Sequence, residues 1–462
     1  MTAAQRLSVV DEIFLRTHRG LGTPIALQGL WRTADRVDPE LLRRVHTVLR
    51  VGPLGRRVIR PSVPGARRSW RANARAYPLE FTDGTIATED LLRWADEQGA
   101  NLDPEYGPGW RLSTAALDDG GSIVSLTCSH ALADGRALVL AVDDALGGPS
   151  LTTSPVPADT GSGMRSASKA GEPDRSDARM NASLGRETRA AASDWSDTRR
   201  QWSIVVRGTF HALRRGIPER PARTAPTREQ GISTPESGSV AGRVGAESAP
   251  TLSVVLQCPA ADWESAAAAQ GGTANSLFIA LIAKMLLASG FPAETIDASL
   301  PVDTRDEPRV DNDLAMTEIT IERTDTAATI REKARIAYER RMSSPGGMPE
   351  ELLQVIPDRW AYALSKGAGE RDILCSNIGT LPDSLRSLGP HRCTGVAARA
   401  IHPGLTADLL PRTRLSGYLC RIADTYTLAV VSLDPAHIGT PGTLRTLADE
   451  TATALGLPIT LW

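Results

Sequence analysis

The stretch SIVSLTCSHALADGRALVLAVDDAL, residues 122–146, predicts a strand, a tight turn and a helix in immediate succession. Residues 122–127 read as a strand of mainly apolar and β-branched side chains, and residues 136–146 place apolar side chains at helical spacing. His130 and the pair Asp134–Gly135 fall in the turn between them. Because a strand-to-helix turn tends to present side chains to a cleft, this stretch predicts an α/β domain with a functional site at the turn.

His130 is the candidate catalytic residue of this turn. Histidine exchanges a proton near neutral pH without a large pKa shift, so a cleft-facing imidazole suits general-base catalysis. Asp134 either orients the imidazole or ties the turn to the rest of the domain, and Gly135 allows a tight turn at the helix entrance. The alternative is an ordinary strand-to-helix turn without catalysis.

Other chemistries fit the sequence less well. It holds no GxSxG, P-loop or GxGxxG motif, and its other histidines form no HExxH-like pair. A metal at His130 and Asp134 would lack further ligands, so no metal site is expected. The five cysteines are scattered and odd in number, which argues against a disulfide framework.

Length and charge limit the class of protein. A chain of 462 residues with 41% hydrophobic residues can form two substantial cores. The net charge of −2 and the dispersed arginines argue against nucleic-acid binding. The N-terminus lacks the uninterrupted apolar core of a secretory signal. We therefore expect a cytoplasmic protein.

The pattern along the chain indicates two α/β halves joined by a flexible bridge. Residues 151–193 and 219–250 are poor in large apolar side chains and are expected to be a disordered insertion and a flexible linker. Residues 194–218 form an amphipathic helix with Trp202 and Phe210 on one face, which either docks on its own domain or contacts a membrane or lipid. The halves themselves are residues 1–150 and 251–462.

HALADG resembles the HxxxDG motif of the thioester-dependent acyltransferase superfamily, which includes chloramphenicol acetyltransferase, condensation domains, polyketide-associated acyltransferases and wax ester synthase/diacylglycerol acyltransferases. Many members have a doubled His, where this chain has Ser129. LSVVDEIFL, TPIALQGLW, GPLGRRV and GPGWRL, at residues 7–15, 23–31, 52–58 and 107–112, resemble the wax ester synthase group. TANSLFIALIAKML resembles a helix in which that group has Asn-Asp, where Ser276 follows Asn275 here. LPVDTRDEP and CSNIGTLP, at residues 300–308 and 375–382, look more like the condensation and polyketide-associated branches.

This resemblance implies an α/β fold of two chloramphenicol-acetyltransferase-like subdomains, each a mixed sheet with helices, flanking a central tunnel. His130 would act as general base on an acceptor hydroxyl or amine that attacks an acyl-CoA or acyl-carrier thioester, without an acyl-enzyme and without a further cofactor. Asp134 would form a structural ion pair, with Arg57 or Arg56 as the candidate partner. The candidate tunnel residues are Ser376, Asn377, Trp110, Asn275 and Arg305.

Three functions therefore stay open at this point. The first is an O-acyltransferase that uses acyl-CoA and a hydroxyl acceptor, expected to be lipid-like, with peripheral membrane contact. The second is a free-standing condensation-type enzyme that joins acyl groups from carrier proteins. The third is a degenerate member that binds without catalysis, which Ser129 and Ser276 keep in view.

Overall fold

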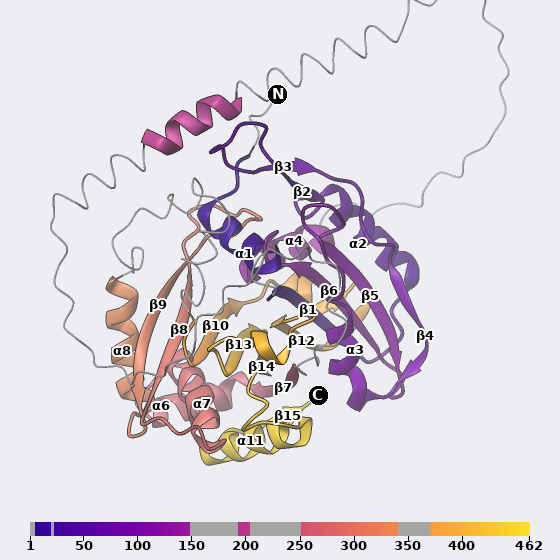
Figure 1. The fold of residues 1–462 in the computed structure, drawn as a ribbon. Coiled ribbons are helices and arrows are strands. Elements are labelled where there is room, and N and C mark those ends of the chain that lie inside the picture. Colours follow the sequence, from indigo (N-terminus) through magenta and orange to yellow (C-terminus); the bar gives the residue numbers. More distant parts are fainter. Residues whose placement is uncertain (1–4, 20–22, 148–192, 204–250, 341–369) are drawn as a thin grey trace, which may run out of the picture.

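Two mixed β-sheets form the framework of the molecule (Figure 1). The computed structural model describes residues 5–19, 23–147, 193–203, 251–340 and 370–462. Residues 151–192 of the insertion expected at 151–193 and the linker at 219–250 lie outside the described residues, as do residues 350–365, whose sequence also predicts a helix.

The first sheet has six strands within the described residues, in an order that joins distant parts of the chain. Its strands in spatial order are β11 (Ser387–Leu388), β12 (His391–Ile401), β1 (Ala26–Thr33), β6 (Ser122–Ser129), β5 (Trp110–Leu117) and β4 (Glu80–Ile86). β1 pairs antiparallel with both β12 and β6, whereas β4 and β5 run parallel. The sheet is therefore mixed, as expected.

The second sheet has seven strands in the part of the chain that the structure describes. They are β15 (Thr460–Leu461), β7 (Leu252–Pro259), β14 (Thr425–Ser432), β13 (Leu415–Ile422), β10 (Ile373–Thr380), β8 (Thr295–Asp303) and β9 (Leu314–Glu322). β10 is parallel to β13 and β8, while the other pairs are antiparallel. A separate hairpin consists of β2 (Arg56–Ile59) and β3 (Ser69–Ala72).

β12 corrects the expected division of the chain at residue 251. It lies in the C-terminal half of the sequence but pairs along its length with β1 in the first sheet. Ala26 of β1 is opposite Ile401 on one side and Ser129 of β6 on the other. The two halves therefore share a sheet.

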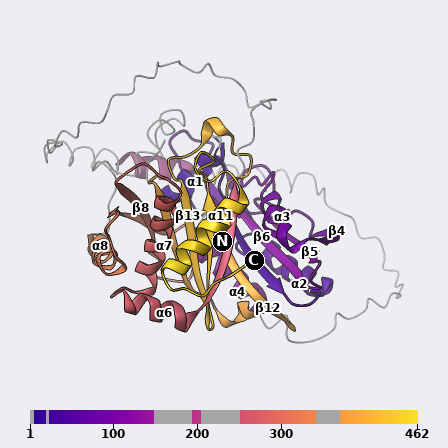
Figure 2. The same cartoon turned by 90° about the horizontal axis from the view of Figure 1, so that it is seen from below.

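Helices cover both sheets. α2 (Pro39–Val51) and α4 (Gly135–Gly147) pack on one face of the first sheet, and α3 (Leu91–Glu97) lies near Gln28 on the other. α6 (Ala260–Ala269), α7 (Ala274–Ala288), α8 (Ala327–Arg340) and α11 (Pro441–Ala454) cover the outer face of the second sheet; Figure 2 shows α11 lying across it. α1 (Val9–Arg19) contacts the turn after β6, where Phe14 stacks on His130.

The local sequence explains several of these boundaries. Asp38 caps α2 by accepting a hydrogen bond from the Glu40 N–H at 2.9 Å, and Pro39 occupies the first turn, as the sequence predicts. Thr273 and Ser276 form a capping box at the start of α7. Ser276 is thus a helix-capping residue.

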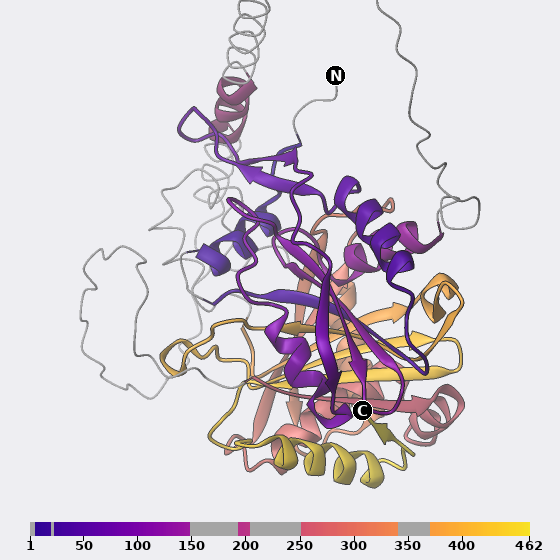
Figure 3. The ribbon, with the colours of Figure 1, turned by 90° about the vertical axis from the view of Figure 1, so that its right-hand side faces the viewer.

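Two hydrophobic cores result from this arrangement. One contains the inner side chains of the first sheet and also reaches the second, through residues such as Tyr418 and Val431. The other lies between the second sheet and its outer helices. Figure 3 shows the strands of the first sheet in front of those of the second. The expected pair of α/β subdomains is confirmed.

No single helix among the described residues has the length and apolar character to cross a membrane; α6 and α7, bent by 81° at the break between them, meet those two criteria only as a pair.

The amphipathic helix expected at 194–218 is described over residues 193–203 only. This part docks on the protein through buried acidic side chains. Asp197 pairs with Arg67 at 2.7 Å, and Asp194 pairs with Arg6 at 2.7 Å. Trp195 and Trp202 remain exposed. The docked face is therefore acidic, and the half-exposed indole of Trp202 lies against Gly65 at its edge.

Candidate active site

His130 lies just beyond the end of β6, where its backbone N–H donates to the carbonyl of Ile25 at 3.0 Å. The turn continues through Leu132, whose N–H donates to the Ser129 carbonyl at 2.9 Å. α1 supplies Phe14, whose ring stacks on the imidazole with centroids 3.5 Å apart and planes 12° from parallel. The strand, the turn and α1 thus fix the ring.

The imidazole lines a cavity of about 640 Å³ between the two halves of the molecule. α1, β1 and α4 contribute walls from the first half, and β8, β9, β10 and β13 contribute walls from the second. β12 adds Val396 to Ala400, followed by His402. The expectation of a central tunnel beside His130 is consistent with this cavity, whose size suits a ligand of drug-like dimensions.

Burial keeps the two histidines of the cavity neutral at physiological pH. Burial lowers the pKa of His130, although hydrogen bonds to its own carbonyl and to Asn312 and the charge of Asp134 oppose that shift. Burial, and then the charge of His130, lower the pKa of His402 to about 4. A neutral imidazole has a free lone pair, as a general base requires.

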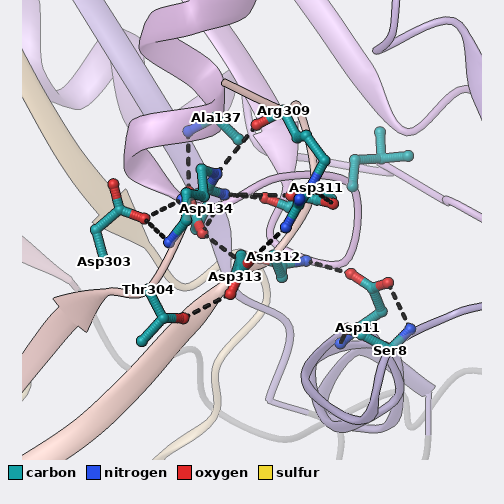
Figure 4. Close-up of polar contacts among 12 residues, drawn as sticks. Ser8, Asp11, Asp134, Ala137, Asp303, Thr304, Arg309, Asp311, Asn312 and Asp313 are labelled. Atoms are coloured by element: carbon teal, nitrogen blue, oxygen red, sulfur yellow. Dashed lines mark hydrogen bonds and ion pairs between the residues drawn. The ribbon is translucent and has the colours of Figure 1, made fainter. Parts of the chain in front are cut away.

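Asp134 caps α4 and anchors a segment of the second half (Figure 4). One carboxylate oxygen accepts from the Ala137 N–H at 2.9 Å. The other accepts from Nη2 of Arg305 at 2.6 Å and from the Asp313 N–H at 3.0 Å. Burial would lower the pKa of Arg305, but its bond to Asp134 and the charge there outweigh burial and raise it. Asp134 is therefore a structural residue that joins the two halves.

Arg305, not Arg57, is thus the partner of Asp134, which corrects the sequence-based assignment. Arg57 lies in β2, opposite Arg71 of β3. Arg56, the other candidate, stacks on Trp70. Its guanidinium donates to the backbone carbonyl of Leu132 at 2.6 Å and so supports the turn through that carbonyl. Arg305 sits in the loop after β8 and is brought to Asp134 only by the packing of the two halves.

Gly135 lies where the start of α4 meets β10 of the second sheet. A Cβ at this position would lie 2.8 Å from the Cδ1 atom of Ile378 in β10. The missing side chain therefore lets α4 approach the second sheet closely.

Of the five candidate tunnel residues, Ser376 is the one that lines the cavity in the described part of the chain. Trp110 is buried beneath His46, with ring centroids 5.2 Å apart. Asn377 donates to Asn275 at 2.9 Å, and its side-chain oxygen accepts from the Gly379 N–H at the bulge in β10. These three side chains support strands and helices, and Arg305 holds Asp134.

An apolar arm of the cavity leads away from His130 along α4 and β1. Gly135, Leu138, Val139 and Val142 lie on one face of α4, and Leu27, Gly29 and Trp31 lie on one face of β1. Trp31 and Val142 also line a small void on their far side, bounded by α2 and β5. Trp31 therefore stands between the arm and a second apolar space.

Four residues of the site were not expected from the sequence: Phe14, Trp31, Asn312 and His402. Phe14 and Trp31 lie in LSVVDEIFL and TPIALQGLW, two stretches that the sequence singles out only by their resemblance to the wax ester synthase group. Asn312 and His402 lie in loops remote from the motif in sequence, so no local pattern indicates them.

The described residues hold no group of His, Cys, Asp and Glu side chains that could bind a metal ion. Cys128 is the cysteine nearest the motif, and burial raises its thiol pKa to about 12. Ser129 is also buried. Neither side chain suits a nucleophile.

No family model matches the chain, and no curated protein matches it in sequence. Solved structures do match its fold. The first condensation domain of the CDA synthetase superposes with a TM-score of 0.57 at 15% identity, over 98% of this chain and 96% of that one. The chain has the condensation-domain fold.

Two further structures support this conclusion. Polyketide synthase associated protein 5 from Mycobacterium tuberculosis matches with a TM-score of 0.52 at 13% identity, covering 98% of each chain. The starter condensation domain of rhizomide synthetase, a mutant in complex with C8-CoA and Leu-SNAC, gives a TM-score of 0.52 at 13% identity, over 98% of this chain and 94% of that one. The condensation-domain fold therefore spans both halves; the specific likeness to wax ester synthases has no counterpart among these matches.

Proposed function

We propose that this protein is an acyltransferase that moves an acyl group from a CoA or carrier-protein thioester to an acceptor hydroxyl. The observation that carries the proposal is the partly buried, neutral imidazole of His130 in a cavity between two halves with the condensation-domain fold. The solved rhizomide synthetase domain holds C8-CoA and Leu-SNAC, which supports a thioester as donor.

In the proposed reaction, His130 accepts the proton of the acceptor hydroxyl as its oxygen attacks the thioester carbonyl carbon. The C–O bond forms and a tetrahedral oxyanion results. When this intermediate collapses, the C–S bond breaks and the imidazolium returns the proton to the departing thiolate. Orientation of both substrates in one cavity contributes much of the rate.

Direct transfer fits the surrounding side chains. Cys128 and Ser129 next to His130 are buried, and the high thiol pKa of Cys128 keeps it protonated. Ser376 lines the cavity and is the proposed hydrogen-bond donor to the oxyanion. The apolar arm beside α4 is the proposed site of the acyl chain, because its walls are hydrocarbon.

A free-standing condensation-type enzyme, which takes acyl groups from carrier proteins and forms an amide or ester, is the second candidate. The matches to condensation domains favour it. A non-catalytic binding member is the third, and it rests on Ser129 in place of a first His. Ser129 is buried, and its Oγ accepts from the Ala131 N–H at 3.4 Å, so its role is in the turn and not in the cavity.

Mass spectrometry of the products formed from acyl-CoA or from acyl-carrier protein, with a panel of hydroxyl and amine acceptors, tests the proposal. His130→Ala should lose about 10²- to 10⁴-fold in turnover, the usual contribution of a positioned general base. His437→Ala is the matched control, because His437 bonds to Asp434 in the second half and does not line the cavity.

Ester products from acyl-CoA would support the proposal, and amide products from carrier-bound acyl groups alone would favour the second candidate. Stoichiometric acylation of the wild-type protein by donor alone, or near-normal transfer by His130→Ala, would refute direct transfer by this histidine.

A further inference from the structure

Asn312 is a buried amide from the second half that reaches the imidazole of His130. It lies in the loop between β8 and β9. Its Oδ1 is 3.2 Å from Nδ1 of His130. Its Nδ2 donates to Oδ1 of Asp11 at 2.9 Å, to the His130 carbonyl at 2.9 Å and to the Ala131 carbonyl at 3.2 Å.

These contacts fix which way the amide points. The NH₂ group faces three oxygen acceptors, and the opposite orientation would place the amide oxygen against all three. The oxygen of Asn312 therefore faces the imidazole. Because an amide oxygen only accepts, Nδ1 of His130 must carry the proton, and Nε2 keeps its lone pair.

The amide is held from both sides. Asp11 is a buried carboxylate of α1 whose other oxygen accepts from the Ser8 N–H at 2.9 Å. The residues flanking Asn312 are fixed as well: the Asp313 N–H donates to Asp134, and Arg305 donates to the carbonyl of Asp311. The chain of contacts from Asp11 through Asn312 to His130 therefore has little freedom to rearrange.

We infer that Asn312 is a positioning residue that, together with the carbonyl of His130 itself, holds the imidazole in the Nδ1-protonated tautomer and so directs the basic Nε2 lone pair to the reaction. This inference rests on the proposed function for its catalytic consequence. The tautomer itself can be measured without any reaction.

The charged groups around the imidazole determine what a change at Asn312 does to its titration. They are Asp134 in the same turn, paired with Arg305; Asp11 in α1, near Arg56; and His402 after β12. Loss of the Asn312 bond removes an interaction that raises the pKa of His130, so Asn312→Ala should move the acid limb of the pH profile to lower pH. Asn312→Asp adds a carboxylate beside the ring and should move it to higher pH.

The experiment combines ¹⁵N NMR of histidine-labelled full-length protein with steady-state kinetics. The His130 signal, assigned by comparison with His130→Ala, should show protonated Nδ1 at pH 7.5. Asn312→Ala should lower kcat by about 10- to 100-fold with little change in KM, by analogy with the loss of the partner that orients a metal-ligating histidine. Thr304→Val is the matched control, because its hydroxyl bonds to Asp313 in the same loop without contacting His130; its kinetics and pH profile should match the wild type.

A wild-type spectrum with protonated Nε2 would overturn the inference, as would an Asn312→Ala variant with unchanged kcat and an unchanged acid limb. A purely structural role would lower the melting temperature of Asn312→Ala without moving the pH profile, and would also overturn it. If no donor supports transfer by the wild-type protein, the proposed function fails while the NMR result still decides the tautomer.

Discussion

The ion pair between Asp134 and Arg305 should contribute strongly to the stability of the protein. Each side chain is only 5% exposed, and Arg305 Nη2 lies 2.6 Å from the carboxylate of Asp134. Removing one member of such a pair leaves a buried charge without its partner, which costs about 3–5 kcal/mol in free energy of unfolding. Arg305→Met keeps the apolar stem and removes the charge. Because Asp134 retains the N–H donors of Ala137 and Asp313, we expect the lower end of this range, about 3 kcal/mol.

A double-mutant cycle measured by urea unfolding tests this value. Asp134→Asn, Arg305→Met and the double variant should give a coupling free energy of about 2 kcal/mol, because Arg305→Met leaves Asp134 without its charged partner and Asp134→Asn then removes that charge. Asp134→Asn alone leaves Arg305 its contact with Asp303 at 2.8 Å. The cycle of Asp134→Asn with Arg57→Ala is the control, and it should be additive within about 0.5 kcal/mol. Additivity between Asp134 and Arg305, or coupling between Asp134 and Arg57, would refute the assignment of the partner.

Three further predictions concern pH, chain length and the docked helix. Burial lowers the pKa of His130 below its ordinary value of 6.5, so the imidazole stays neutral as pH falls to 6.5. The acid limb of the kcat/KM profile should therefore lie below pH 6.5, and a limb above that value would contradict the burial argument. Trp31→Leu should open the apolar arm toward the void behind it and favour longer acyl donors. Since each buried CH₂ contributes about 0.8 kcal/mol, kcat/KM should rise about fourfold for each added methylene that the arm accepts. An unchanged chain-length profile would place the acyl chain elsewhere. Asp197→Ala should release helical residues 193–203 from Arg67 and so increase their cleavage in limited proteolysis. Ser203→Ala is the control on the same helix. Cleavage of Asp197→Ala equal to that of the wild type would show that this ion pair does not hold the helix.

The strand-turn-helix unit around His130 could be predicted from the sequence because its determinants are local. An apolar strand, a polar turn and a helical repeat follow one another within residues 122–146. The start of α2 at Asp38 and Pro39 is local in the same sense. Such signals need no knowledge of distant residues.

The partners of the turn could not be predicted, because they come from the other half of the chain. Arg305 was expected in the tunnel and Asn312 was not expected in the site; both lie in a loop crowded with charged residues, where nothing in the local pattern indicates that they bind the turn. β12 was missed because its sequence, HRCTGVAARAI, is rich in Ala and Arg and poor in β-branched residues. Its strand conformation depends on pairing with β1.

The position of β12 between β11 and β1 has a consequence for how the chain reaches its native state during synthesis. The Thr394 hydroxyl of β12 donates to the Arg32 carbonyl of β1, and 362 residues separate the two along the chain. Until the ribosome has made β12, one edge of β1 has no partner, and exposed strand edges promote aggregation. The first sheet therefore completes only after β12 has been translated. We expect the nascent N-terminal half to be prone to aggregation until then, and we expect poor yields when the two halves are expressed separately.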